Sequence, residues 1–362
     1  MKYEDNKEGV YEFGETNQAF KFHEGKIWID GVEFNNGLIE ARWFPKKEIR
    51  WFAEEPKNSK NNIIPIFDLE DKELNILDSK NNYFSLSAKI TSTNPPSGYI
   101  PEIEIGDSKH PLKKVIAHWI NGPNIIPGEN VIFHYKNRTS YQKGRISFSG
   151  AGYNILIDPR PHLSKEIKKA KECGGYILSH AMEITREDGG SFTGKEAKDL
   201  LYALQLALSF ARGNFTSPNI PTGFDFNNEI MWQNWSIKHA EKYGIGVSWW
   251  DPHTSEDLKD FLNLFLNKFV DSDPDAWKTL KFITQSALAS NNEGFIEQKI
   301  VTAFSALDHL YWYKYVLKGD GKLSKKRKYE DQRIRRMIFD ISHKYQVPKE
   351  LKTLSYWAKT KI

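Results

Sequence analysis

Arg336 and His343 are the two residues whose types and spacing most readily suggest chemistry. They stand seven positions apart in "RMIFDISH", where a guanidinium could neutralise a phosphodiester and an imidazole could move a proton beside it. The same stretch also fits an ordinary charged helix, because Asp340 lies at i+4 from Arg336 and at i−3 from His343. On a continuous helix the pair would lie roughly 10 Å apart, so both could hold one phosphate only if the helix breaks or a second protomer completes the site.

The segment around this pair is strongly basic. Residues 314–362 hold 15 Lys/Arg against 5 Asp/Glu, a local net charge of +10, whereas the whole chain carries only +4. Such an asymmetry predicts an anionic partner for this segment. The alternative is a pair of solvated basic helices with no partner.

The elements that must position these residues divide into three predicted segments. Residues 1–160 are rich in short alternating runs, and Arg-Trp-Phe at 42–44 recurs at 50–52 around a proline-containing loop, as in a hairpin. This pattern predicts a β-sandwich-like domain, with "TSTNPPSGYIP" (91–101) as a surface connection. Residues 161–250 form a mixed α+β extension, and residues 254–362 form a helical domain. The predicted fold class is therefore multidomain α+β.

One helix in the middle segment is marked at both ends. Thr193 is the expected N-cap, Glu196 its capping-box partner, and Gly213 the left-handed C-terminal stop. Seven apolar residues at helical spacing between these ends predict that the helix is buried.

Several classes of function have no signal in the sequence. The single cysteine, Cys173, excludes an internal disulfide framework, and the ten histidines show no metal-ligand spacing. We expect no metal and no cofactor. Without an apolar leader or an 18-residue apolar run, the chain is predicted to be cytoplasmic with no membrane partner. Four tryptophans lie in strand-like runs, where they either fill the core or stack on sugar or base faces: Trp28, Trp43, Trp51 and Trp119.

The stretch from Gly175 to about Trp250, with "GGSFTGKEAKDLLYALQLALSFARGN", "GFD" and "WWDPH", resembles bacterial proteins in which a β-rich half precedes a HEPN-type helical domain. The layout is similar to that of ApeA-type phage-defence proteins. This resemblance implies a helical bundle, often dimeric, that cuts RNA without metal once the β-rich half senses infection. Its trigger would be a phage-derived protein or a small ligand.

The resemblance implies roles for particular residues. Arg336 and His343 match the arginine–histidine signature at its upper spacing limit, although Met337 departs from the polar residue expected after the arginine. Asp308 in "FSALDHL" is the candidate for an acidic residue near that site, with an ordinary helix-edge aspartate as the alternative. The expected RNA-binding residues are Lys325, Lys326, Arg327, Lys328, Arg333 and Arg335. A further alternative places the true signature beyond residue 362.

Three functions remain open at this point. The first is antiviral defence, in which a β-rich sensor is coupled to a helical domain that binds or cleaves RNA. The second is a non-catalytic ligand-binding protein whose helices pair two protomers. The third is a carbohydrate-active enzyme built on the β-rich half, which would need two facing carboxylates in a cleft.

Overall fold

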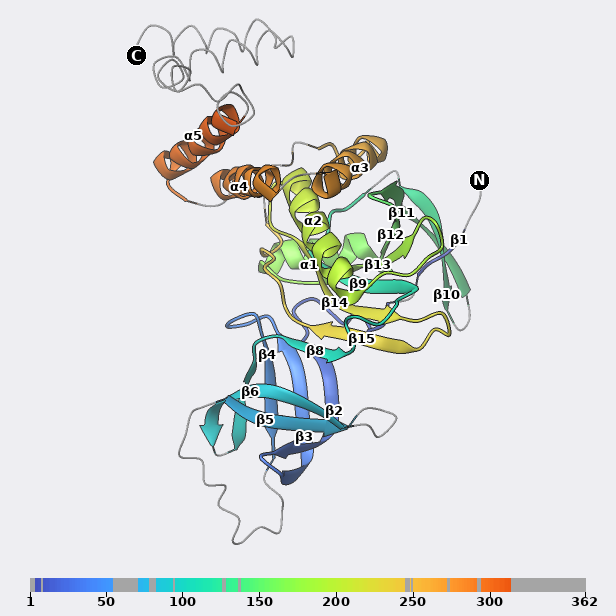
Figure 1. Cartoon of the computed structure of the whole chain (residues 1–362), viewed down its shortest axis with the longest axis vertical. Coiled ribbons are helices and arrows are strands. Elements are labelled where there is room, and N and C mark those ends of the chain that lie inside the picture. The colour runs from blue at the N-terminus through green and yellow to red at the C-terminus, as the bar shows by residue number, and fades with distance from the viewer. Residues whose placement is uncertain are drawn as a thin grey trace, which may run out of the picture. The chain divides into compact units, whose positions relative to one another are not determined.

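The computed structural model describes residues 4–7, 9–54, 71–77, 83–93, 95–125, 128–135, 138–244, 248, 250–271, 274–291 and 294–313 (Figure 1). The chain divides into two compact units, Met1–Val270 and Asp271–Ile362. The fold is mixed α+β, as predicted, with a β-rich N-terminal region and helices toward the C-terminus. Within the described ranges, no helix combines the length and the apolar composition needed to cross a bilayer.

The six strands that follow β1 in the chain, β2 to β7, close into a barrel in the order β2-β3-β4-β7-β6-β5. Their bounds are β2 (Phe20–Ile29), β3 (Val32–Arg42), β4 (Glu48–Ala53), β5 (Asp71–Leu77), β6 (Tyr83–Thr93) and β7 (Pro96–Ile100). The predicted hairpin is confirmed, since Arg42 on β3 pairs with Glu48 on β4. Alternate residues face the barrel core, where Trp51 and Phe34 are fully buried. The predicted surface connection at 91–101 is wrong, because β7 runs through it.

Gly98 shows why β7 fits between its neighbours. A Cβ atom at this position would lie 1.7 Å from the carbonyl oxygen of Lys89 on β6. Only a residue without a side chain allows the two strands to approach this closely.

The remaining strands form a nine-stranded sheet in the order β1-β10-β11-β12-β13-β9-β14-β15-β8. Their bounds are β1 (Glu4–Asp5), β8 (Ile103–Gly106), β9 (Lys114–Ile120), β10 (Glu129–Tyr135), β11 (Arg138–Gly150), β12 (Tyr153–Pro159), β13 (Leu178–Arg186), β14 (Ser217–Phe224) and β15 (Ile230–Trp235). All neighbours are antiparallel except β1 and β10, which are parallel.

The predicted β-sandwich is therefore replaced by a barrel and a continuous sheet. The barrel closes because β2 pairs with β5 as well as with β3. Strand β9, which follows the barrel in the chain, pairs with β13 and β14 from the segment 161–250. The predicted boundary at residue 160 thus cuts across one sheet.

Two helices lie in the connections of this sheet: α1 (Leu163–Cys173) between β12 and β13, and α2 (Gly194–Arg212) between β13 and β14 (Figure 1). The expected ends of α2 are confirmed. The Thr193 hydroxyl accepts from the Glu196 N–H, the Glu196 carboxylate accepts from the Thr193 N–H, and Gly213 is left-handed with φ 79°. The apolar side of α2 is buried and contacts β14.

Helix α3 (Ser255–Asp271) packs on the first unit through buried Leu258, Leu262 and Leu266. Its residue Asn263 donates to the carbonyl of Ser149 at the end of β11, at 2.6 Å. The second unit contains α4 (Pro274–Asn291) and α5 (Ile296–Trp312), which pack against each other. Helices predicted after residue 313 lie outside the described residues, so the HEPN-type bundle stays a prediction.

Candidate functional site

The N-terminal residues 4–7 and 9–18, which we call the strap, cross one face of the nine-stranded sheet. They are attached to several strands by hydrogen bonds far apart in the sequence. Arg145 donates to the carbonyl of Asp5 at 2.6 Å, and the Lys7 N–H donates to the Asp158 carboxylate at 2.6 Å. Further along, Arg160 donates to the carbonyl of Gly14 at 2.7 Å. The strap therefore begins as strand β1, which pairs with β10 at the edge of the sheet, and side chains of the sheet hold the residues that follow.

The register of the sheet explains why these side chains meet on one face. Ala181 on β13 lies opposite both Asp158 on β12 and His118 on β9, and His118 lies opposite Asn219 on β14. Directly opposed residues in antiparallel strands point to the same side. One row of the sheet thus presents a carboxylate, an imidazole and an amide toward the strap. Glu183, two residues along β13, forms a 2.8 Å ion pair with Lys7 of the strap.

Arg145 and Asp158 form a buried ion pair beneath the strap. Arg145 Nε donates to Asp158 Oδ1 at 2.7 Å and Nη2 donates to Oδ2 at 2.8 Å, with side chains only 2% and 1% exposed. Asp158 Oδ2 also accepts the Lys7 N–H. Because each charge is met by several hydrogen bonds, the pair compensates its own desolvation and anchors the start of the strap.

His118 and Arg160 each keep one buried nitrogen without a hydrogen-bond partner: Nδ1 of His118 and Nε of Arg160. Burial lowers the pKa of His118 to about 4, so the imidazole is neutral near pH 7. Its Nε2 lies 3.4 Å from the Tyr11 nitrogen of the strap and accepts that N–H. A neutral imidazole that accepts at Nε2 carries its proton on Nδ1, so the unpartnered atom is a donor.

Tyr11 attaches the middle of the strap to β15. Its hydroxyl accepts from Gln233 Nε2 at 3.1 Å and from Trp235 Nε1 at 3.2 Å. Burial raises the pKa of this phenol to about 12. Its ring meets Phe20 of β2 edge to face, with centroids 4.7 Å apart. Tyr11 therefore links the strap, the sheet and the barrel.

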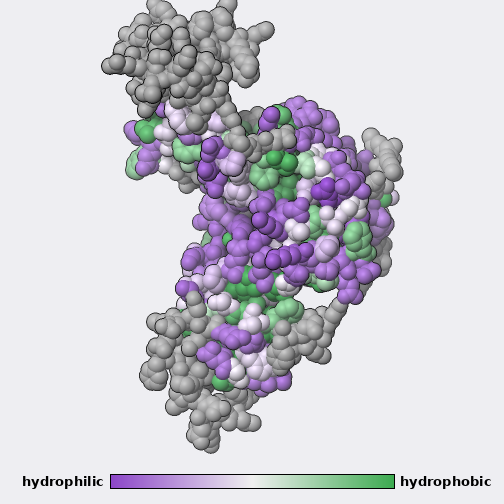
Figure 2. Space-filling view, viewed as in Figure 1, coloured by the Kyte–Doolittle hydropathy of each residue, from purple (hydrophilic) through white to green (hydrophobic). Residues whose placement is uncertain are grey.

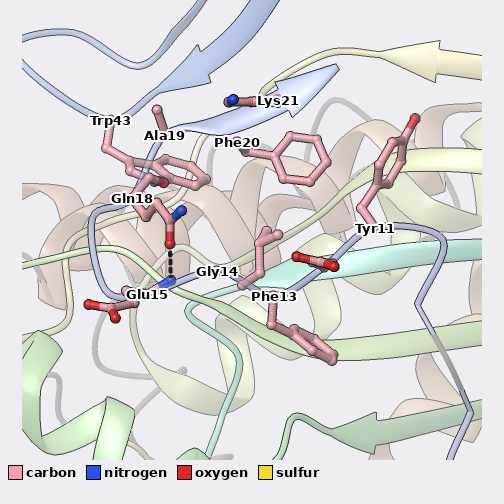
Figure 3. A pocket seen from close by; sticks show the side chains of 11 residues that line it. Tyr11, Phe13, Gly14, Glu15, Gln18, Ala19, Phe20, Lys21 and Trp43 are labelled. Atoms are coloured by element: carbon pink, nitrogen blue, oxygen red, sulfur yellow. Dashed lines mark hydrogen bonds between the residues drawn. The ribbon is translucent and has the colours of Figure 1, made fainter. Parts of the chain in front are cut away.

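A cavity of about 390 Å³ opens between the strap and the start of the barrel (Figure 3). Phe20 and Trp43 lie on its barrel side, and the backbone of Gly14 and Glu15 lies on the facing side. The complete lining is Tyr11, Glu12, Phe13, Gly14, Glu15, Gln18, Ala19, Phe20, Lys21, Trp43 and Leu178. A volume of this size lies in the range of small-ligand sites.

Hydrogen bonds fix the shape of this cavity. Trp43 Nε1 donates to the carbonyl of Gln18 at 2.7 Å, and the Gln18 side chain accepts the Glu15 N–H at 2.6 Å (Figure 3). The Trp43 indole also stacks on Tyr176, with centroids 5.6 Å apart and planes inclined by 19°. The wall is thus formed before any ligand binds.

A second cavity of about 330 Å³ lies between α2 and the strands β14 and β15. Its polar groups largely satisfy one another. Glu102 accepts from Lys238 at 3.0 Å and from Asn234 at 2.8 Å, and Gln205 donates to the carbonyl of His239 at 3.1 Å. This internal pairing leaves the second cavity less suited to a ligand than the first.

Most residues predicted from sequence to form a site lie outside the described residues, so their arrangement stays a prediction. Arg336 and His343 lie outside the described residues, as do the predicted RNA-binding residues Lys325, Lys326, Arg327, Lys328, Arg333 and Arg335. Asp308 is half-buried on α5. Within the described ranges, no group of three His, Cys, Asp or Glu side chains converges as a metal site would require.

The residues that shape the first cavity were missed, with one exception. Trp43 was singled out as core or stacking surface, and it is 4% exposed while bordering the cavity. Trp51 and Trp119 are fully buried, which confirms the core interpretation for them, whereas Trp28 is half-buried. The strap is a polar segment without periodicity, and its two aromatic residues, Tyr11 and Phe13, are no denser than in the chain as a whole, so no sequence signal marked it.

A family model described as the YopA central domain matches residues 107–244. This segment contains β9 to β15 with α1 and α2, the larger part of the sheet beneath the strap. A relative in Bacillus subtilis (strain 168), the SPbeta prophage-derived uncharacterized protein YopA, is 26% identical over 220 residues. That alignment covers 57% of this chain and 49% of the relative, so the chain spans about half of the relative's length. No solved structure matches this chain.

Proposed function

We propose that the first unit is a ligand-binding module and that the cavity between the strap and the barrel is its site. The observation that carries this proposal is the cavity's position, where the strap, the barrel strand β2 and the sheet strand β13 all contribute to its wall. A ligand there would touch three parts of the unit at once. Such a site suits a sensor, because occupancy would tie the barrel to the sheet.

The prearranged wall supports the same proposal. Ordered walls lower the entropic cost of binding, and the Trp43 and Gln18 hydrogen bonds supply that order. Binding rather than catalysis is the proposed role because the wall consists of aromatic rings and backbone held by these hydrogen bonds. The YopA central domain, which forms the sheet side of the site, would provide the stable floor.

A fragment screen by ligand-observed NMR tests this proposal. Fragments should bind the wild-type protein and lose binding when Ala19→Trp fills the cavity with an indole. A matched substitution in the second cavity, Leu201→Met, should leave binding unchanged. If Ala19→Trp folds normally and every fragment still binds, the site lies elsewhere and the proposal fails.

A second candidate function concerns residues 314–362, and the local net charge of +10 favours it. We propose that this segment binds RNA, with Lys325–Lys328 and Arg333–Arg335 contacting phosphates, in a protein of phage defence. Arg336, His343 and Asp308 would carry metal-independent cleavage. The prophage origin of the Bacillus subtilis relative suits a place in phage biology. A homodimer would supply a second copy of the arginine and histidine.

Labelled RNA incubated with the protein and a chelator tests this candidate. Cleavage that disappears in Arg336→Ala and in His343→Ala supports the enzyme. Salt-dependent binding without cleavage supports an RNA-binding role alone. If the full chain neither cleaves nor binds RNA, this second candidate function is refuted.

A further inference from the structure

We propose that the cavity between the strap and the barrel selects a small organic cation, an ammonium or guanidinium compound with an apolar portion. This inference rests on the proposed ligand-binding role and adds the chemical class of the ligand. Two features of the lining carry it: aromatic rings from both the barrel and the strap, and strap carboxylates that form no ion pair with another described residue.

The aromatic part of the lining consists of Tyr11, Phe13, Phe20 and Trp43. Their rings are fixed by mutual contacts, with Tyr11 against Phe20 and Trp43 against Tyr176. Aromatic faces carry partial negative charge, and cations bind to them more strongly when water is excluded. Rings held in advance favour such a ligand without an ordering cost.

The strap supplies negative charge beside these rings. Glu12 and Glu15 both line the cavity, and neither carboxylate forms an ion pair with another described residue. Lys21 is the one basic residue in the lining, and its ammonium is bound to Glu24 at 2.7 Å. The charge that the lining offers to a ligand is therefore negative.

The nearest buried cation does not reverse this conclusion. Arg160 lies behind the strap with its guanidinium over the Phe13 ring, and it donates to the carbonyls of Phe13, Gly14 and Leu178. Burial lowers the pKa of the Arg160 guanidinium, and the negative charge of Glu166 offsets part of that lowering. Arg160 thus fixes the strap through Nη1 and Nη2, and although its buried Nε has no hydrogen-bond partner, the residue does not line the cavity.

Three probes that share a benzene ring and differ in charge test the inference: benzyltrimethylammonium, benzyl alcohol and benzoate. Isothermal titration with the full chain should give a Kd for the cation at least tenfold lower than for the alcohol, and no binding of benzoate. The double variant Glu12→Gln/Glu15→Gln should weaken the cation at least fivefold and leave the alcohol unchanged. Glu172→Gln, an exposed glutamate on α1, is the matched control and should change neither.

The outcomes separate this inference from the proposed function. If the alcohol or benzoate binds as tightly as the cation, and Ala19→Trp abolishes that binding, the cavity is a ligand site but cation selection is overturned. If none of the three probes binds, or if Ala19→Trp leaves binding of all three intact, both proposals are overturned. Circular dichroism establishes that each variant is folded before titration.

Discussion

The buried ion pair under the strap allows a quantitative prediction. Asp158→Asn keeps the shape of the side chain but leaves the Arg145 guanidinium, which is 2% exposed, without its counter-charge. Removing one partner of a buried pair costs about 3–5 kcal/mol. The asparagine also replaces one acceptor oxygen with an NH₂ group, which faces either Arg145 or the Lys7 N–H, and both are donors. We therefore expect a loss of about 4 kcal/mol in the free energy of unfolding of the first unit.

Urea unfolding followed by tryptophan fluorescence measures this loss. A double variant tests whether the loss comes from the unpaired charge of Arg145. Arg145→Met/Asp158→Leu removes both charges at similar volume, so it should recover most of the stability that Asp158→Asn loses. Glu24→Gln breaks the exposed pair with Lys21, which solvent screens, and should leave the urea midpoint unchanged.

Hydrogen exchange locates the effect within the molecule. The Lys7 amide donates to Asp158, so it should exchange faster in Asp158→Asn than in the wild-type protein by more than the global destabilisation accounts for. An Asp158→Asn variant within about 1 kcal/mol of wild type, with an unchanged Lys7 amide, would refute the anchoring role of the pair.

Three further predictions concern single side chains. Thr193→Ala removes the capping box of α2 and should cost about 1 kcal/mol in urea unfolding, whereas Thr193→Ser should be near neutral. Tyr11→Phe leaves the Trp235 indole N–H without an acceptor and the Gln233 amide with only Thr222 Oγ1 at 3.4 Å, and should cost about 1–3 kcal/mol, measured in the same way. Burial holds the pKa of His118 at about 4, below the 6.5 of an unfolded histidine, so the unfolded state binds more protons between these values. Stability from this group is present above pH 6.5 and lost as pH falls toward 4, by roughly 3 kcal/mol. Urea unfolding at several pH values checks this. If the wild-type protein loses no more stability than His118→Gln between pH 6.5 and pH 4, the assigned role of His118 is contradicted.

Local signals in the sequence predicted local structure well. The repeated Arg-Trp-Phe placed the hairpin of β3 and β4, and Thr193 with Gly213 placed both ends of α2. These features depend on turn and cap chemistry within a few residues, which a sequence displays directly. The strand β7 was missed because Pro96 stands at its first position, where a proline is tolerated in a sheet.

The candidate site could not be predicted in the same way. Its contacts join residues 151 positions apart, for Lys7 and Asp158, and 222 positions apart, for Tyr11 and Gln233. The strap has no regular secondary structure over most of its length, so it leaves no periodic pattern to read. The closure of the barrel depends on pairing of β2 with β5, and the neighbours of β9 are β13 and β14. Such long-range pairings cannot be read from the sequence of any one strand.

The long separation between the strap and its anchors has a consequence for synthesis of the chain. The barrel strands lie between the two in sequence, so all of them are made before Asp158 leaves the ribosome. At elongation rates of about 5–20 residues per second, the 151 positions from Lys7 to Asp158 take on the order of 10–30 s. For that interval the Lys7 amide has no Asp158 to bind, and the Tyr11 hydroxyl waits longer still for Gln233 and Trp235, so these anchors of a segment made first can form only late in synthesis.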